Sequence, residues 1–396
     1  MTKKKAFLMW VVALTGMLQM PSMGASAAVR TMVEVFGREL VEVQTSMASS
    51  GIVLPIVSII VAILIRKEIV SKRTVVIFGL GLLSFTGFLS IFIHKWFWSI
   101  RLMAIMQGLA AGCYVSTAIS LVIDDFTVDE RRKINGMHSV FVGLGGIVLC
   151  IAGGLLVNLL WYAGYLLFLL SLPLFILSFF AIPKKPKTKK TAETGEKKKR
   201  SKINPDIFYY VALVLIFMII YNSSASNIST HFKNNGIGDY ARFAGFATAT
   251  QMAGTMLMSF FFNKLSKKFG DMIISFAFAF IFIGFTIINV FSKSIVMMFI
   301  GIFIMGLSMP CLGPQAILAI SKRVDDSTSA IGTSLANGIA PGLGTFLSPV
   351  IITNLTNALA PDNTNFRYQF AGCLALAMAV LVFILSKVRE KKYGEI

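Results

Sequence analysis

The chain has 396 residues, of which 56% are hydrophobic and only 14% are Asp, Glu, Lys or Arg. A soluble domain carries about 25% charged residues, so this chain has too few to cover a water-facing surface. These figures exclude a cytosolic enzyme, a nucleic-acid-binding protein and a disordered protein. The net charge of +19 would otherwise suggest a nucleic-acid partner, but the basic residues are concentrated in short segments between apolar stretches.

The apolar stretches are long enough to cross a bilayer. A hydrocarbon core of about 30 Å takes roughly 20 residues of helix. Helices are required there because lipid offers no partner for backbone N–H and C=O groups. We therefore predict an all-α membrane protein with spans near residues 6–29, 43–65, 74–93, 97–123, 135–160, 162–182, 207–230, 243–262, 272–291, 295–320, 329–353 and 367–387.

The positions of Lys and Arg predict the orientation. With the N-terminus in the cytoplasm, the loops on that side hold 29 of the 37 basic residues and the outer loops hold 7. This split follows the positive-inside rule. We expect a multi-pass protein of the plasma (cytoplasmic) membrane with both termini in the cytoplasm.

The first 28 residues also have features of a cleavable signal peptide. Lys3 to Lys5 precede an apolar run that leads to Ala25-Ser26-Ala27. The run is long for a signal peptide, and cleavage would leave eleven spans. We expect the segment to be retained as the first helix.

The longest hydrophilic stretch divides the twelve spans into two sets of six. We expect an N-terminal six-helix bundle at 1–182, a basic cytoplasmic linker at 183–205 and a C-terminal bundle at 206–396. The halves share a weak repeat, because Asp124-Asp125 follows the fourth span and Asp325-Asp326 follows the tenth. The linker is expected to be a solvated tether attracted to membrane lipid headgroups, with a regulatory docking site as the alternative.

Short motifs point to a known family. The loop after the second span has Glu68 and then Lys72-Arg73, and the loop after the eighth has Lys267 and Gly270. Gln107-Gly108 follow Arg101 in the fourth span, and Gly153-Gly154 lie in the fifth. In motifs and in its six-plus-six architecture the chain resembles the major facilitator superfamily, in a bacterial drug-efflux-like or unassigned branch. Leu149-Cys150 replace the Gly-Pro that the family associates with antiporters.

The resemblance implies two bundles that alternate in opening a central site to either side of the membrane, without enzyme activity. In the family, charged side chains at the cytoplasmic helix ends pair in one state and part in the other. The gating residues expected on this basis are Glu68, Lys72, Arg73, Asp124, Asp125, Arg131, Lys267 and Asp271.

Polar residues within the spans are the candidates for binding substrate. Arg101 is the only ionised residue that we place well inside a span, and it either faces the cavity or reaches the interface. The family's cavity is lined mainly by spans one, four, seven and ten, and each of these carries an amide. Such groups bind a substrate or join helices. The uncharged candidates are Gln19, Gln107, Tyr221, Asn222, Asn227, Gln251, Gln315 and Asn337.

Prolines and glycines within spans mark expected hinges and close helix contacts. Proline interrupts the hydrogen-bond ladder, and span ten, with two prolines near its middle, should bend or unwind locally. Glycine lets neighbouring helix backbones approach. The residues expected to act in this way are Pro21, Gly108, Gly145, Gly146, Gly153, Gly154, Pro310, Pro314 and Pro341.

Few residues in the sequence indicate what drives transport. There is no Walker A pattern, and no Asp or Glu lies mid-span. Glu34 either pairs with Arg30 at the interface or carries a proton. His94 and His231 are expected in outer loops and His138 near the inner end of span five, so we predict no metal site and no cofactor.

We predict a monomeric secondary transporter for a small organic solute. Efflux of amphipathic compounds, coupled to a proton or sodium gradient, is the first interpretation, because Met and aromatic surfaces adapt to varied ligands. The alternative is an uptake symporter or facilitator for a small metabolite or organic anion, with Arg101 as the anion contact.

Overall fold

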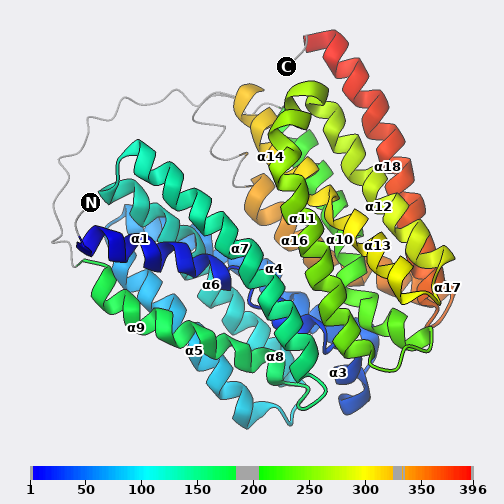
Figure 1. The fold of residues 1–396 in the computed structure, drawn as a ribbon, viewed down its shortest axis with the longest axis horizontal. Coiled ribbons are helices and arrows are strands. Elements are labelled where there is room, and N and C mark those ends of the chain that lie inside the picture. The colour runs from blue at the N-terminus through cyan, green and yellow to red at the C-terminus, as the bar shows by residue number, and fades with distance from the viewer. Residues whose placement is uncertain (1–2, 184–204, 324–331, 333–334, 394–396) are drawn as a thin grey trace. The chain divides into compact units, whose positions relative to one another are not determined.

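The computed structural model describes residues 3–183, 205–323, 332 and 335–393, and over those ranges it contains helices and no strands (Figure 1). The chain forms two compact units. The first comprises residues 1–38 and 46–199, and the second comprises 39–45 and 200–396. Residues 184–204, nearly all of the expected linker, and Asp325-Asp326 lie outside the described residues.

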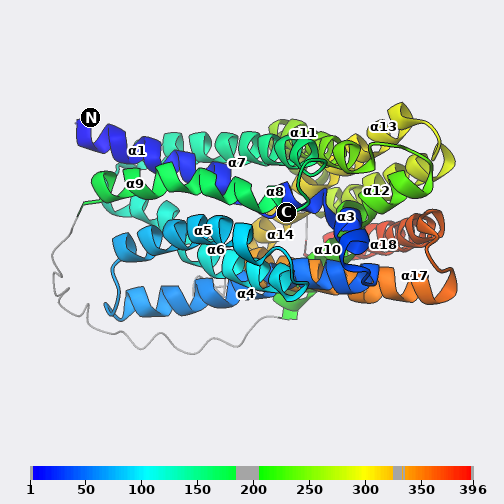
Figure 2. The same cartoon turned by 90° about the horizontal axis from the view of Figure 1, so that it is seen from below.

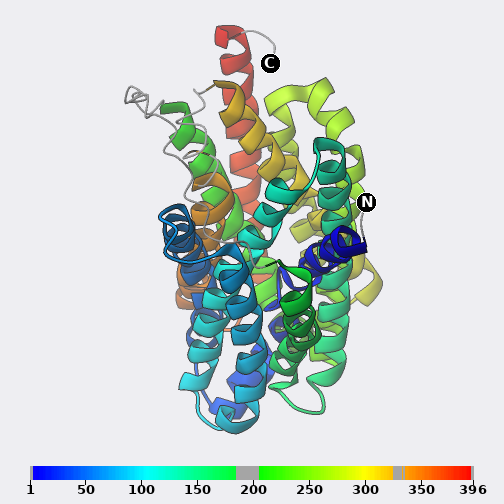
Figure 3. The ribbon, with the colours of Figure 1, turned by 90° about the vertical axis from the view of Figure 1, so that its left-hand side faces the viewer.

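The first unit contains a broken first span followed by long helices. Helices α5 and α6 run alongside one another (Figure 3). The elements are α1 (Lys3–Thr15), the 3₁₀ turn η1 (Gly16–Leu18), α2 (Met23–Ser26), α3 (Val29–Phe36), α4 (Leu40–Arg66), α5 (Lys72–Ile93), α6 (Trp98–Asp125), α7 (Val128–Leu156), α8 (Ala163–Leu166), the 3₁₀ turn η2 (Leu167–Leu170) and α9 (Ser171–Ala181). The first turn of α4, residues 40–45, packs with the second unit.

The second unit has the same helical character, with more irregular turns. Helix α12 packs against α18 and α13 (Figure 2). The elements are α10 (Pro205–Asn234), α11 (Tyr240–Phe269), the 3₁₀ turn η3 (Gly270–Met272), α12 (Ile273–Val290), α13 (Ile295–Gly306), α14 (Ser308–Arg323), the π-helical turn η4 (Leu335–Ile339), α16 (Ala340–Ser348), the π-helical turn η5 (Pro349–Thr353), α17 (Asn354–Leu359) and α18 (Thr364–Tyr393).

The described helices agree with the predicted spans. Eleven described segments are long and apolar enough to cross a membrane, and one of these, residues 240–290, is 51 residues long. That length exceeds a single crossing of roughly 20 residues. The segment holds α11 and α12, and α11 ends at Phe269, directly before Gly270, whose φ of 51° is unfavourable for other residues. The prediction of an all-α membrane protein is confirmed, and twelve spans are consistent with these helices.

Glycines set the packing of the first unit. A Cβ at Gly153 of α7 would overlap the carbonyl oxygen of Gly24, and one at Gly145 would overlap that of Met17. Helix α7 therefore lies directly against the broken first span. In the same unit, a Cβ at Gly108 of α6 would lie 2.9 Å from the carbonyl oxygen of Ser50 in α4. Gly146 and Gly154 are also buried.

The prolines coincide with the irregular turns. Pro21 follows η1, and α13 ends at Gly306, four residues before Pro310. Pro310 has no N–H to donate to the carbonyl of Gly306, and the helix restarts as α14 after Leu307. Pro314 lies inside α14. Pro341 follows η4 and Pro349 begins η5, so span eleven has two π-helical turns, a form often found at functional sites.

We expect Gly153→Ala to destabilise the protein by about 2 kcal/mol, because the added methyl group would overlap the Gly24 carbonyl. Thermal unfolding of the purified protein in detergent measures this. Gly136→Ala in the same helix is the control, since a Cβ there meets no atom within 4 Å. Equal melting temperatures for the two variants would show that α7 does not lie against Gly24.

Candidate functional site

The break in the first span exposes polar backbone and a polar side chain within a membrane-crossing segment. Gln19, Met20 and Ser22 lie between η1 and α2 and are half-buried. The described part of the chain provides no hydrogen bond to the Gln19 side chain. Irregular backbone at membrane depth is tolerated where it is buried in protein or lines a cavity. The break is therefore a candidate binding site.

Neighbouring helices hold this break in place. The hydroxyl of Tyr114 in α6, a fully buried residue, donates to the carbonyl oxygen of Leu18. Met17, Met20 and Met23 are half-buried around the break, and the Cys150 thiol of α7 lies 3.7 Å from the sulfur of Met23. The break thus combines one amide with several flexible thioethers, which adapt to apolar surfaces of varied shape.

Span ten has a second break, between α13 and α14, and a hydroxyl from a neighbouring helix again donates to a carbonyl there. The hydroxyl of Thr255 in α11 donates to the Gly306 carbonyl oxygen at 2.9 Å and to that of Gln251 at 3.1 Å. Gln251 is buried beside Gly306, and its Nε2 has no hydrogen-bond partner among the residues that the structure describes. This amide keeps an unused donor in the second unit.

Asn227 of α10 is the centre of a buried polar network. Its Oδ1 accepts from Nη1 of Arg367 at 2.8 Å and from Nε2 of Gln44 at 3.0 Å. Its Nδ2 donates to the hydroxyl of Thr353 at 3.2 Å. Arg367 also donates from Nε to Thr356 at 3.1 Å. The network therefore joins α10, η5, α17, α18 and the first turn of α4 within the second unit.

Two sequence expectations were wrong here. Arg101 was expected to be the ionised residue well inside a span, but it is exposed one turn after the start of α6, whereas Arg367, at the predicted start of the twelfth span, is fully buried in α18. His231 was placed in an outer loop, but it is fully buried in α10, with Nδ1 3.1 Å from the Thr364 hydroxyl. Both residues lie near span ends, where boundaries cannot be read from hydropathy.

Gln315 and Asp271 form a second polar cluster with Tyr210. The Asp271 carboxylate accepts from the Tyr210 hydroxyl at 2.5 Å and from Nε2 of Gln315 at 3.1 Å. The Ser266 hydroxyl donates to Oε1 of Gln315 at 2.6 Å. Gln315 thus joins helices in this structure, and Asp271 binds α10 and α14 of its own unit. The guanidinium of Arg389 lies 4.3 Å from the Tyr209 ring, beside this cluster.

The other predicted polar residues are dispersed. Tyr221 stacks on Phe217 at 5.4 Å, and the Asn222 amide donates to the Met218 carbonyl of its own helix. Gln107 is buried in α6, two turns before Tyr114. Asn337 is exposed in η4.

The predicted gating cations contact helix ends within the first unit. Lys72 donates to the Ser120 carbonyl at 3.2 Å. Arg73 donates to the Phe179 carbonyl at 2.8 Å and also to the Ile182 carbonyl. Arg131 donates to the Phe126 carbonyl at 2.8 Å. These carbonyls lie at or near the C-terminal ends of α6 and α9, where cations are favoured by the helix dipole. Glu68 is exposed with φ 57°, and Lys267 is exposed. The side chains of Asp124 and Asp125 lie outside the described structure.

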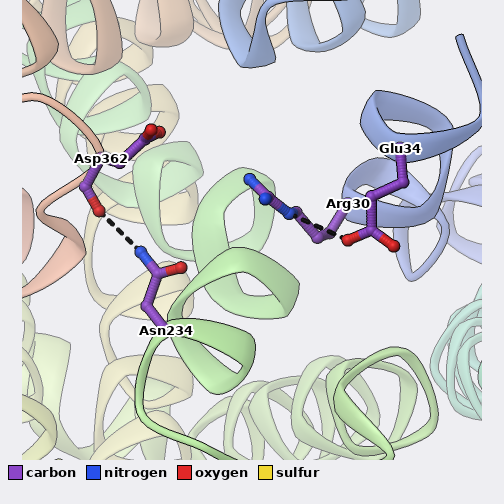
Figure 4. A network of polar contacts seen from close by, with 4 residues as sticks. All are labelled: Arg30, Glu34, Asn234 and Asp362. Atoms are coloured by element: carbon purple, nitrogen blue, oxygen red, sulfur yellow. Dashed lines mark hydrogen bonds and ion pairs between the residues drawn. The ribbon is translucent and has the colours of Figure 1, made fainter. Parts of the chain in front are cut away.

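Polar groups at the helix ends have local partners. Glu34 accepts from Nε of Arg30 at 3.1 Å, as the interfacial alternative predicted, and Asn234 donates to the Asp362 carbonyl at 2.6 Å (Figure 4). The Thr127 N–H donates to Glu130 at the start of α7. This bond holds the pKa of Glu130 below its usual value because it favours the charged form.

We expect Asn227→Leu to destabilise the protein by about 3 kcal/mol, because Arg367 would keep its charge and lose its closest acceptor. Unfolding in detergent measures the loss. Adding Arg367→Met should recover much of it, since an apolar pair buries no unsatisfied charge. Asn354→Leu, at an exposed position of α17, is the control. A double variant no more stable than Asn227→Leu alone would contradict this role of the charge.

Comparisons with known proteins agree with the fold. The nucleoside transporter NupG is 12% identical, with a TM-score of 0.76 over 97% of this chain and 98% of that one. A D-xylose-proton symporter is 12% identical, with a TM-score of 0.73 over 95% and 97%. A POT family transporter solved with 5-aminolevulinic acid is 13% identical, with a TM-score of 0.73 over 96% of each chain. No match was found among curated protein sequences.

The family assignment rests on the sequence itself. The family model described as Major Facilitator Superfamily matches residues 6–238, which is more than half of the chain. Its members are transporters rather than enzymes, as the sequence motifs predicted. The chain is a multi-pass membrane protein that belongs to the major facilitator superfamily.

Proposed function

We propose that the chain is a secondary active transporter that exports small amphipathic compounds by alternating access, using a proton or sodium gradient. The observation that carries the proposal is the break in the first span, where the Gln19 amide is half-buried and its side chain is unbonded within the described structure. Broken helices at membrane depth supply substrate sites in several transporter folds. In this proposal the protein is a monomer in the plasma membrane, and both of its termini lie in the cytoplasm.

The chemistry of the break favours a partly apolar substrate. Gln19 offers one donor and one acceptor, Ser22 adds a hydroxyl, and the methionines around them offer adaptable apolar surface. No Asp, Glu, Lys or Arg lies between Lys5 and Arg30. A neutral or weakly polar molecule can therefore be bound without the cost of burying an unpaired charge.

Uptake of a polar metabolite or organic anion is the second candidate. Two similar solved structures are a nucleoside transporter and a D-xylose-proton symporter, whose named substrates are polar. The buried amide of Gln251, whose Nε2 donor is unused within the described ranges, would suit such a molecule. A thermal-shift screen separates the two candidates, because a ligand that binds the folded state raises its melting temperature.

For a compound identified in this screen, we expect Gln19→Ala to lower the initial rate of transport in vesicles about fivefold, the value of one neutral hydrogen bond. Ser26→Ala is the matched control, because the Ser26 hydroxyl donates to the Met23 carbonyl of its own helix. Normal transport by Gln19→Ala would remove the break from the substrate path. Transport that fails in the unmodified protein as well would contradict the proposed function itself.

Arg101→Ala tests the remaining role of that residue. Because its side chain is exposed near the start of α6, we expect it to reach the interface and the variant to keep near-normal transport. Flux into vesicles is measured for anionic and neutral compounds. A selective loss of anion flux would instead favour the uptake alternative, with Arg101 as the anion contact.

We expect accumulation to stop when the pH gradient across the vesicle is collapsed, because a secondary transporter takes its driving force from an ion gradient. Accumulation is measured with and without an ionophore that dissipates the pH gradient, and again without sodium. Loss only on removing sodium would identify sodium as the coupling ion. Equilibration that is insensitive to both would show a facilitator.

A further inference from the structure

A groove runs between α11 and α13 of the second unit. It has a volume of about 470 Å³ and is lined by Phe243, Thr250, Ile295, Val296, Phe299, Ile300 and Phe303. The two helices are in close contact further along, where a Cβ at Gly254 would overlap the Phe303 carbonyl and one at Gly306 that of Gln251. The groove lies nearer the N-terminal ends of the two helices and reaches Phe243 and Ile295 there.

The groove is suited to an apolar chain. Its only polar side chain, Thr250, donates to the Phe246 carbonyl of its own helix at 2.9 Å. The buried Phe232 contacts two lining residues. Its ring stacks on that of Phe299, with 6.3 Å between the ring centroids, and meets the Phe243 ring edge-on, with 6.4 Å between the centroids. The rim is open, because Val296 is 69% exposed and Ile300 43% exposed. Both helices belong to membrane-crossing segments, so lipid hydrocarbon is the medium at this rim.

Positive charge gathers at the N-terminal end of the groove. Arg242 directly precedes Phe243, and Lys293 lies two residues before Ile295. The N-terminal ends of α11 and α13 lie at this same end and add partial positive charge. Asp239 offsets only part of it, through a pair with Arg242 at 3.9 Å between two half-exposed side chains. An anionic group is therefore favoured at this end.

We propose that the groove binds one phospholipid with an anionic headgroup. An acyl chain lies along Phe299 and Ile300, and the phosphate is held by Arg242 and Lys293. The volume is within the range of ligand pockets, about 300 to 1,000 Å³. A second copy of this chain fits less well, because in a symmetric contact it would bring the same cations together.

Native mass spectrometry of the purified full-length protein tests this proposal. The protein is titrated with phosphatidylglycerol and, separately, with zwitterionic phosphatidylcholine of the same chains. We expect one phosphatidylglycerol to bind about tenfold more tightly, since each basic residue near an anionic headgroup adds to its attraction. Equal binding of the two lipids, or a dimer in place of the lipid-bound monomer, would overturn the proposal.

Two variants locate the site. Arg242→Gln with Lys293→Gln should remove the preference for phosphatidylglycerol, whereas Arg38→Gln with Lys95→Gln, which removes two cations from the same predicted side of the first unit, should keep it. Ile300→Trp should displace the lipid by filling the groove, and Val380→Trp, at an exposed position of α18, is its control. A preference that survives both groove variants would place the lipid elsewhere and overturn the proposal.

Discussion

A peptide group inside a bilayer must find its hydrogen-bond partner within the protein, because lipid supplies none. Pro21 and Pro310 each remove one N–H from a membrane-crossing segment. At Pro310 the Thr255 hydroxyl of a neighbouring helix donates to the Gly306 carbonyl, which the missing N–H would have bonded, and near Pro21 the Tyr114 hydroxyl donates to the Leu18 carbonyl inside the break. Glycines bring α7 close to the first break and α11 close to the second. The broken helices therefore depend on their neighbours, and removing such a neighbour would expose bare carbonyls to lipid.

The same constraint explains why many polar side chains in the described spans already have hydrogen-bond partners. Asn227 forms hydrogen bonds with Arg367, Gln44 and Thr353. Asp271 forms hydrogen bonds with Tyr210 and Gln315. Networks of this kind fix which helices lie together, while their net contribution to stability is limited by the cost of burying the groups. An amide that such a network uses is a poor candidate for binding a mobile substrate. By the same reasoning, Gln19 and Gln251 retain the capacity that a substrate would use.

The arrangement of the helix ends shows where sequence reasoning reached its limit. Lys72 and Arg73, which follow α4, were expected to pair with acidic partners in gating, and in the described structure they also donate to carbonyls of α6 and α9. Every residue has a backbone carbonyl, so the sequence does not show which carbonyl a basic side chain contacts. A basic residue that binds a carbonyl therefore cannot be distinguished in the sequence from one that pairs with a carboxylate. Arg367 and His231 were misplaced for a related reason, since a charged or polar residue near a span end has the hydropathy of a loop whether it faces water or is buried.

By itself the sequence determined the helical membrane fold, the number of spans, the positions of the breaks and the family, because each follows from local properties: apolar length, proline, glycine and short motifs. Only the tertiary structure decided which polar groups meet, such as Gln44 with Asn227 across 183 positions of the chain. Apolar side chains on different helices are nearly interchangeable in hydropathy. The register between helices is set by the joint fit of glycine contacts and hydrogen-bond partners, which no local pattern contains.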